Sequence, residues 1–342
     1  MEIQYGGDTV TVFTISPRTR DVGEYWNNID ACIRYSERHG ATGILLFEGN
    51  DTYISPWIAA QAAFERSERL CPLVAVNPIY MHPFTVAKFV NSFAQLYGRR
   101  TYLNMITGTA LSYLQAMNDE LGHDRRYDRL REYVEVISAL LGSERGIAYD
   151  GEFYRANELK LEPPIDSSLQ PLFFFAGASD AATAAARVVD GIQMKMLGAQ
   201  LDLDVKPGET GIHFGIVTRA DHSDAWTAAE ALFKEDKRGE RVQELTMKNT
   251  DSVWKQRMMR AAAMETDSLP GYWLRPFKNF QADCPYFVGS HEEVAKFLAA
   301  LVGRGVRHII LDLPCIEEEF ANVAEACRMA GQRLAAGQPG LA

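Results

Sequence analysis

A closed (β/α)8 barrel, an α/β TIM barrel forming one domain over residues 1–342, is the fold class that this sequence predicts. The chain has 342 residues with 47% hydrophobic content, enough for one large core. Short apolar runs rich in β-branched and aromatic residues alternate with segments whose apolar residues recur about every 3.6 positions. Eight such runs occur, and eight strands with intervening helices favour a closed barrel over an open sheet.

The expected strands are short and lie throughout the chain, at 10–15, 43–47, 73–76, 102–106, 172–175, 191–194, 211–217 and 308–312. Helical spacing is clearest between them at 54–66, 86–96, 127–141 and 226–233. This order is typical of parallel βα units.

Two intervals are too long for a plain βα unit and are therefore predicted insertions, one after strand 4 and one after strand 7. The first, at about 142–170, contains a predicted hairpin over 147–159 that turns at Asp150 and Gly151. The second, at about 234–289, begins with the charged run KEDKRGER. A charge run is usually an exposed face, so we expect a solvated, mobile segment there.

Composition and charge exclude several classes of protein. The chain carries 35 basic and 45 acidic residues, and its formal net charge of -10 repels nucleic-acid phosphates and anionic membrane surfaces. No apolar stretch reaches the roughly 18 residues that suggest a membrane-spanning helix, and residues 1–8 lack the basic and apolar regions of a secretory signal. We therefore expect a cytoplasmic protein that binds neither nucleic acid nor membranes.

The spacing of cysteines and histidines predicts no metal. The five cysteines are scattered and form no CxxC pair, so we expect free thiols in a reducing compartment. None of the seven histidines belongs to a HExxH or comparable zinc pattern.

In a (β/α)8 barrel the chemistry lies at the carboxyl ends of the strands, so polar residues just after each expected strand are the first functional candidates. That rule selects Ser16, Glu48, Asn77, Thr107, Ala178, Ser179, Thr218 and the turn at 312–314.

The segment AGASDAA at 176–182 follows an apolar strand and opens an alanine-rich helix. The unpaired N–H groups of a helix N-terminus, with small residues that permit close approach, are able to hold a phosphate. Ordinary helix capping by Ser179, with Gly177 in the turn, explains the same residues. On the segment alone, the cap is favoured over the phosphate site.

The segment HDRRY at 123–127 opens another predicted helix. His123 and Tyr127 are four residues apart, so they share one helix face and both have a donor for one anion. Arg125 and Arg126 add positive charge. A charged helix start with a surface salt bridge is an equally good interpretation.

His213 lies in a strand where alternation places it on one face with Gly211 and Gly215. Its side chain titrates near neutrality, which makes it a candidate acid or base, although a structural histidine is the more common occurrence. Tyr80 and His82, after the third strand, are weaker candidates.

Taken together, these segments resemble the luciferase-like monooxygenase superfamily, which includes bacterial luciferase. They resemble especially the branch that contains the FMNH2-dependent alkanesulfonate, nitrilotriacetate and long-chain alkane monooxygenases. The similar stretches are HPFTVAKFVNSFAQLYGRRTYLNMITGT (82–109), HDRRYDRLREYVEV (123–136), PLFFFAGASDAA (171–182) and GIHFGIVTR (211–219). All four stand in the family's order and spacing.

The resemblance implies a two-component flavoprotein that receives reduced FMN from a separate NAD(P)H-dependent flavin reductase. O2 is the cosubstrate, and a C4a-peroxyflavin oxygenates a small organic substrate. His213 would transfer a proton or stabilise the peroxide. The implied cofactor-binding residues are His123, Tyr127, Ala178 and Ser179 near the phosphate and Asn77, Asn104 and Thr107 around the flavin. The implied substrate-lining residues are Tyr53, Trp57, Tyr80, His82, Phe280 and Leu313, and the insertion at 234–289 would be a lid.

The sequence departs from alkanesulfonate monooxygenase at several positions. Thr52 and Tyr53 stand where that enzyme has a Cys, Gly211 where it has an Arg, and Leu313 where it has a Tyr. An Arg of its long insertion is replaced by Phe280 or a neighbour. An unpaired sulfonate in an aromatic pocket would be poorly solvated, so we expect a larger, less charged substrate, such as an intermediate of specialised metabolism. Oxygen insertion, hydroxylation and C–S cleavage stay open.

Two alternatives stay open beside the FMN monooxygenase. One is an F420-dependent hydride-transfer oxidoreductase of the same superfamily, which the HDRRY and AGASDAA segments favour less. The other is a noncatalytic flavin-binding partner subunit, against which stand eight complete strands and the long insertion. The resemblance also implies a homodimer or homotetramer.

Overall fold

The computed structural model describes residues 1–17, 21–108, 110–200, 204–263 and 269–338. Residue 109 of the stretch 82–109 and residues 264–268 of the second insertion therefore lie outside the described residues. The strands are β1 (Ile3–Tyr5), β2 (Asp8–Ile15), β3 (Gly43–Leu46), β4 (Leu73–Val76), β5 (Tyr102–Met105), β6 (Ile147–Asp150), β7 (Arg155–Leu159), β8 (Phe173–Ala176), β9 (Ile192–Met196), β10 (Thr210–Arg219), β11 (Tyr272–Trp273), β12 (Tyr286–Ser290) and β13 (His308–Asp312).

The helices begin and end close to the periodic segments of the sequence. They are α1 (Val22–Arg38), α2 (Pro56–Glu65), α3 (Pro83–Tyr97), α4 (Leu111–Ala116), α5 (His123–Gly142), α6 (Asp180–Val188), α7 (His222–Leu232), α8 (Lys237–Lys248), α9 (Val253–Ala263), α10 (Arg275–Lys278), α11 (His291–Gly303) and α12 (Glu317–Ala335), with a 3-10 turn at Ser167–Leu169.

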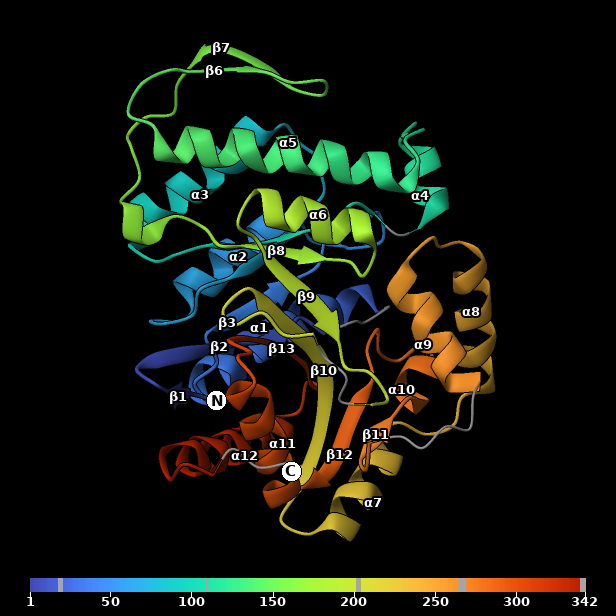
Figure 1. The fold of residues 1–342 in the computed structure, drawn as a ribbon. Coiled ribbons are helices and arrows are strands. Elements are labelled where there is room, and N and C mark those ends of the chain that lie inside the picture. Colours follow the sequence, from blue (N-terminus) through green and yellow to red (C-terminus); the bar gives the residue numbers. More distant parts are fainter. Residues whose placement is uncertain (18–20, 109, 201–203, 264–268, 339–342) are drawn as a thin grey trace.

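Eight parallel strands close into a barrel in the order β2-β3-β4-β5-β8-β9-β10-β13 (Figure 1). The pairing of β13 with β2 closes the ring, with His308 beside Thr11 and Leu311 beside Thr14. All eight predicted strands are confirmed. β10 is longer than predicted because its carboxyl half leaves the barrel to pair with β12, from Gly215 beside Tyr286 to Arg219 beside Ser290.

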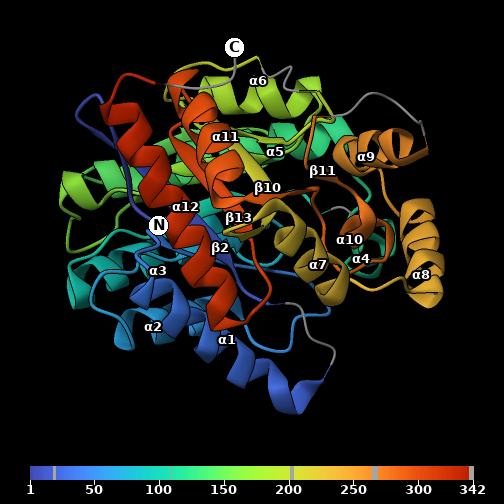
Figure 2. The same cartoon turned by 90° about the horizontal axis from the view of Figure 1, so that it is seen from below.

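Side chains of alternate parity fill the inside and the outside of the barrel, as strand geometry requires. The ring of Phe13 meets Tyr102 and Phe174 edge-to-face inside, with centroids 5.0 and 5.6 Å apart. The other interior cluster members include Ile15, Leu45, Leu73, Ile192, Met194 and Ile310. Residues of opposite parity, such as Ile309 and Leu311, pack against the surrounding helices. In Figure 2, α11 and α12 lie side by side.

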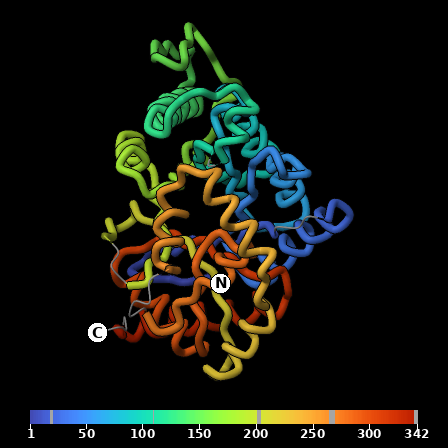
Figure 3. The backbone as a smooth tube through the Cα atoms, turned by 90° about the vertical axis from the view of Figure 1, so that its right-hand side faces the viewer, coloured from blue at the N-terminus to red at the C-terminus, as the bar shows by residue number. Residues whose placement is uncertain are grey.

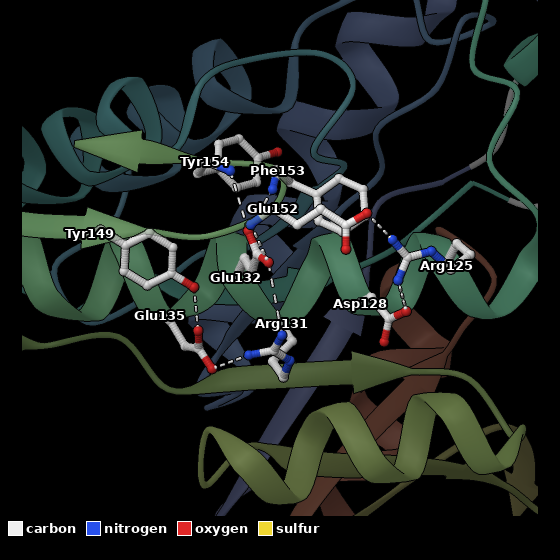
Figure 4. Close-up of polar contacts among 9 residues, drawn as sticks. All are labelled: Arg125, Asp128, Arg131, Glu132, Glu135, Tyr149, Glu152, Phe153 and Tyr154. Carbon is white, nitrogen blue, oxygen red and sulfur yellow. Dashed lines mark hydrogen bonds and ion pairs between the residues drawn. The ribbon is translucent and has the colours of Figure 1, made fainter.

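The first insertion contains the predicted hairpin, formed by β6 and β7 on the outer side of α5 (Figure 1). One carboxylate of α5 binds the backbone of the hairpin turn. Glu132, only 5% exposed, accepts the backbone N–H groups of Glu152, Phe153 and Tyr154 at 3.0, 2.8 and 3.2 Å (Figure 4). A Cβ at Gly151 would lie 2.3 Å from Glu132, so glycine permits this approach. The hairpin is thus fastened to the helix that also carries His123 and Tyr127.

We expect the Glu132→Ala substitution to lower the free energy of unfolding by about 3 kcal/mol, because it leaves three backbone donors without their charged acceptor. Urea denaturation measures this loss. The matched control is Glu135→Ala one turn away, where a 27% exposed carboxylate pairs with Arg131 and Tyr149. That change should cost less than about 1 kcal/mol. Equal losses in the two variants would show that Glu132 does not hold the turn.

The second insertion contributes α8, α9, β11, α10 and β12, and Figure 3 shows its yellow and orange segments away from the green hairpin. The charged run that opens it is exposed, as predicted, but it leads into a regular helix. Asp236 caps α8 by accepting the N–H of Arg238 at 2.9 Å. The Asn279 amide donates to Lys234 O at 2.7 Å, which ties the start of the insertion to the turn after α10. No helix among the described residues is both long and apolar enough to cross a membrane.

His308, at the amino end of β13, predicts how stability depends on pH. Its Nδ1 lies 2.8 Å from the Thr11 hydroxyl, and burial lowers the pKa of His308 to about 4. A histidine with a lowered folded-state pKa binds protons better when unfolded, so stability falls as pH drops below about 6.5. We expect His308 to cost about 2 kcal/mol between pH 7 and pH 5. Urea titrations of the native chain and of His308→Gln at both pH values measure this cost. An equal loss of stability in the two proteins between pH 7 and pH 5 would contradict it.

Candidate active site

A group of hydroxyls gathers where α5 and α6 begin, at the carboxyl ends of β5 and β8. The Tyr127 hydroxyl donates to Ala176 O at 3.3 Å, and the hydroxyls of Thr107 and Ser179 lie within hydrogen-bonding reach of it. His123, one turn before Tyr127, has its ring centroid 5.2 Å from the Tyr127 ring. Burial raises the pKa of Tyr127, so its hydroxyl stays protonated and is able to donate to an anion.

The loop before α6 brings its backbone close to this group. Ser179 is the N-cap of α6, and its hydroxyl accepts the N–H of Ala182 at 3.1 Å, so the capping interpretation is correct. A Cβ at Gly177 would lie 2.4 Å from the Tyr127 hydroxyl, which only glycine permits without displacement. Capping does not exclude an anion site, because the first turn of any helix keeps other N–H groups without intrahelical partners.

The two arginines of HDRRY form ion pairs and are not free cations. Arg125 pairs with Asp128 and with Glu152 of the hairpin turn (Figure 4). Arg126 is 2% exposed, donates to Leu121 O at 3.1 Å and pairs with Asp251 at 2.6 Å. Asp251 lies just before α9, so Arg126 connects the start of α5 to the second insertion.

Two buried asparagines stand on or just after the neighbouring strands β4 and β5. Asn77 follows β4, is 2% exposed, and accepts the N–H of Ile79 at 3.3 Å. Asn104 on β5 lies in register with Ala75 and Phe174, and Phe174 belongs to the interior cluster, so Asn104 faces the inside of the barrel. It is 7% exposed, and its Oδ1 accepts no hydrogen bond from the described residues. Such a buried acceptor requires a donor that this part of the chain does not supply.

His213 also faces the inside of the barrel. It lies on β10 between Met196 of β9 and Ile310 of β13, and it is 9% exposed. Two residues later, Gly215 has Tyr286 of β12 on one side and Asp312 of β13 on the other. A Cβ at Gly215 would lie 2.3 Å from the Tyr286 ring, so glycine lets that ring lie across the strand.

Cys284 and Asp312 lie close to His213, and Tyr286 contacts Asp312; residue spacing did not identify these residues as a group. The Tyr286 hydroxyl donates to Asp312 Oδ1 at 3.2 Å, and the Cys284 thiol lies 3.7 Å from Asp312 Oδ2. Burial, reinforced by the Asp312 charge, raises the pKa of Tyr286 well above its usual value. The strand-end rule had already selected the turn at 312–314, and the pairing of β10 with β13 places Asp312 two residues beyond the level of His213. We see no comparable sequence signal for Cys284.

The residues predicted to line a substrate pocket separate into two groups. Tyr53 and Tyr80 lie in loops at the carboxyl ends of β3 and β4; Tyr53 contacts Tyr25 edge-to-face at 5.2 Å, and Tyr80 donates to Asn50. His82 ends the same loop as Tyr80, whereas Trp57, Leu313 and Phe280 lie elsewhere. Trp57 stacks on Phe89 between α2 and α3, Leu313 packs with the outer helical cluster, His82 caps α3, and Phe280 stands in the turn after α10 with φ 57°.

A cavity of about 830 Å³ opens between α6, β9 and α9. It includes Gly177 and Ala178 of the α6 loop and Trp254, Arg257 and Met258 of α9. Between β9 and β10, residues 197–200 and 204–209 form no helix, which leaves this side of the barrel open among the described residues. Trp254 also packs against the interior cluster of the barrel. The second insertion therefore covers part of the barrel next to the hydroxyls of Thr107, Tyr127 and Ser179.

Comparisons with known proteins identify a common family. The family model described as "Luciferase-like monooxygenase" matches residues 8–308. The 4-(gamma-L-glutamylamino)butanoyl-[BtrI acyl-carrier protein] monooxygenase BtrO of Niallia circulans is 29% identical over 319 residues, covering 87% of this chain and 90% of its own.

Solved structures show the same fold at low identity. Long-chain alkane monooxygenase (LadA) superposes with a TM-score of 0.71 and 15% identity, covering 95% of this chain and 91% of its own. The oxygenating constituent of 3,6-diketocamphane monooxygenase from Pseudomonas putida, in complex with FMN, has a TM-score of 0.67 and 12% identity, with 96% and 98% covered.

Proposed function

Because this chain belongs to the luciferase-like monooxygenase family and is thereby a flavin-dependent monooxygenase, we propose that its cofactor is reduced FMN, delivered by a separate NAD(P)H-dependent flavin reductase. The structural relative from Pseudomonas putida, described as an oxygenating constituent, fits such a division of labour. We also propose, from the family resemblance, that the chain works as a homodimer or homotetramer.

The observation that carries the FMN proposal is the cluster of three hydroxyls, from Thr107, Tyr127 and Ser179, against the N-terminus of α6. A phosphate there would receive neutral hydrogen bonds and the positive end of the helix dipole. Gly177 keeps the space open, because a Cβ would collide with Tyr127. His123 would donate from the turn of α5 that precedes Tyr127. With Arg125 and Arg126 engaged in ion pairs, oriented hydroxyls and N–H groups would hold the phosphate.

The flavin ring would lie toward Asn77 and Asn104. The unsatisfied Asn104 Oδ1 offers an acceptor for a ring N–H, which is what the buried position requires. Reduced FMN, when bound, supplies the electrons that activate O2. His213 would move a proton in the barrel interior, and the second insertion, with Trp254 against the interior cluster, would exclude water.

The substrate side argues against simple alkanesulfonates. A Cβ at Gly211 would lie 2.3 Å from the Met194 sulfur, so Met194 occupies the space of the arginine that alkanesulfonate monooxygenase carries there. Tyr53 and Tyr80 at the barrel rim are aromatic and uncharged. The relative from Niallia circulans is named for an acyl group on a carrier protein. We propose a larger organic substrate of specialised metabolism, with carrier-bound acyl groups as the first class to test.

Anaerobic binding of reduced FMN and reduced F420, followed by exposure to 18O2, tests this function. We expect reduced FMN to bind at least about 10-fold more tightly, a difference of about 1.4 kcal/mol. With substrate present, one 18O atom should appear in the product. Hydride transfer from reduced F420 without O2 would overturn the proposal, and flavin binding without turnover of any substrate class would indicate a noncatalytic subunit.

A further inference from the structure

Three groups that commonly bind metals converge beside the barrel interior. The ring nitrogens of His213, the thiol of Cys284 and the carboxylate of Asp312 offer one donor atom each, and these atoms all lie within 4.8 Å of one another. Cys284 is fully buried, His213 is 9% exposed and Asp312 is half-buried. They come from three separate parts of the chain, which is why sequence spacing predicted no metal.

The convergence follows from how β10 changes partners. On one side of β10, β9 pairs with its amino half and β12 with its carboxyl half; β13 pairs on the other side, so β12 and β13 flank Gly215. Asp312 is level with Gly215, two residues beyond His213, and therefore lies on the same face of the sheet as His213. Cys284 lies two residues before Tyr286, in the segment that leads into β12, and so approaches from the side of β10 opposite β13.

The distance between Cys284 and Asp312 suits a small tetrahedral ion. Zinc binds cysteine sulfur at about 2.3 Å and carboxylate oxygen at about 2.1 Å. Two such ligands at the tetrahedral angle are about 3.6 Å apart, and the Cys284 sulfur lies 3.7 Å from Asp312 Oδ2. The second oxygen, Oδ1, accepts the Tyr286 hydroxyl at 3.2 Å, the kind of outer contact that orients a metal-binding carboxylate.

We propose that His213, Cys284 and Asp312 form a binding site for a divalent transition-metal ion, with Zn2+ as the best fit to the sulfur, nitrogen and oxygen donors. Binding displaces the Cys284 proton to solvent and uses the neutral imidazole. Three protein ligands leave a fourth position for water. Occupancy removes the His213 imidazole from proton transfer, so the ion inhibits turnover reversibly. The binding rests on the three ligands alone, whereas the inhibition rests on the proposed function.

Cobalt substitution tests the binding without an activity assay. The full chain is freed of metal with a chelator and titrated with Co2+, and Zn2+ affinity is then measured by competition. We expect a near-ultraviolet thiolate-to-cobalt absorption band that saturates at one ion per chain and disappears in Cys284→Ser. Zn2+ affinity should fall at least about 100-fold in Cys284→Ser and in Asp312→Asn, since loss of outer contacts alone costs about 10- to 100-fold.

Cys71→Ser is the matched control, because this partly exposed free thiol is the more accessible of the two. It should leave the band and the affinity unchanged. Circular dichroism establishes that each variant is folded, and Asp312→Asn, which keeps all five thiols, replaces Cys284→Ser if that variant does not fold. No band, or a band that survives in both ligand variants, would overturn the site. Metal binding without inhibition would leave the site standing and contradict the role of His213.

Discussion

Replacing Ser179 with alanine is expected to weaken the binding of reduced FMN about 10- to 100-fold, since a hydrogen bond to a charged group contributes about 1.5–3 kcal/mol. The Ser179 hydroxyl lies within hydrogen-bonding reach of Tyr127 and caps α6, so the substitution removes a proposed phosphate donor and loosens the helix N-terminus. Anaerobic titration with reduced FMN measures the change.

Loss of a helix cap alone costs about 1 kcal/mol of stability, and this effect has to be separated from phosphate binding. Ser290→Ala provides the comparison. Ser290 caps a different helix, α11, through a capping box with Glu293. It should lose similar stability and keep the native affinity for reduced FMN. Equal affinities in the two alanine variants would show that Ser179 is only a cap.

Replacing His213 with glutamine is expected to lower the turnover number about 100- to 10,000-fold, the usual contribution of a positioned acid or base. Affinity for reduced FMN should be unchanged, because His213 lies on β10. The proposed phosphate site follows β5 and β8 instead. Single-turnover experiments with preloaded reduced flavin measure the chemical step apart from cofactor binding.

His308→Gln is the appropriate control, since His308 also lies on the barrel, on the strand next to β10. It stands at the amino end of β13 against Thr11, whereas chemistry in these barrels lies at the carboxyl ends. Its substitution should change stability and leave turnover within about 3-fold of the native value. A small effect of His213→Gln on turnover would leave the histidine with a packing role.

The barrel was predictable because its determinants are local. Each strand is a short apolar run, and the parity of residues such as Phe13 and Ile310 marks their inward face. The hairpin was predictable for the same reason, from Asp150 and Gly151. The departure of β10 from the barrel was not, because it depends on pairing with β12, a strand from a distant insertion.

The candidate site divides in the same way. Ser179 and Tyr127 stand in short motifs whose helix starts are visible in the sequence. Trp57 and Leu313, in contrast, lie between the helices and the barrel, because apolar character alone does not say which face a residue occupies. Strand alternation places Asp312, the neighbour of Leu313, on the inner face instead. Cys284 and Arg126 have their partners 28 and 125 residues away, beyond any local pattern.

A crystal structure of the chain with FMN tests the central claim most directly. The account predicts the phosphate within hydrogen-bonding distance of the Ser179 and Tyr127 hydroxyls, with the flavin ring directed toward Asn104. Phosphate density away from Ser179 and Tyr127 would contradict it.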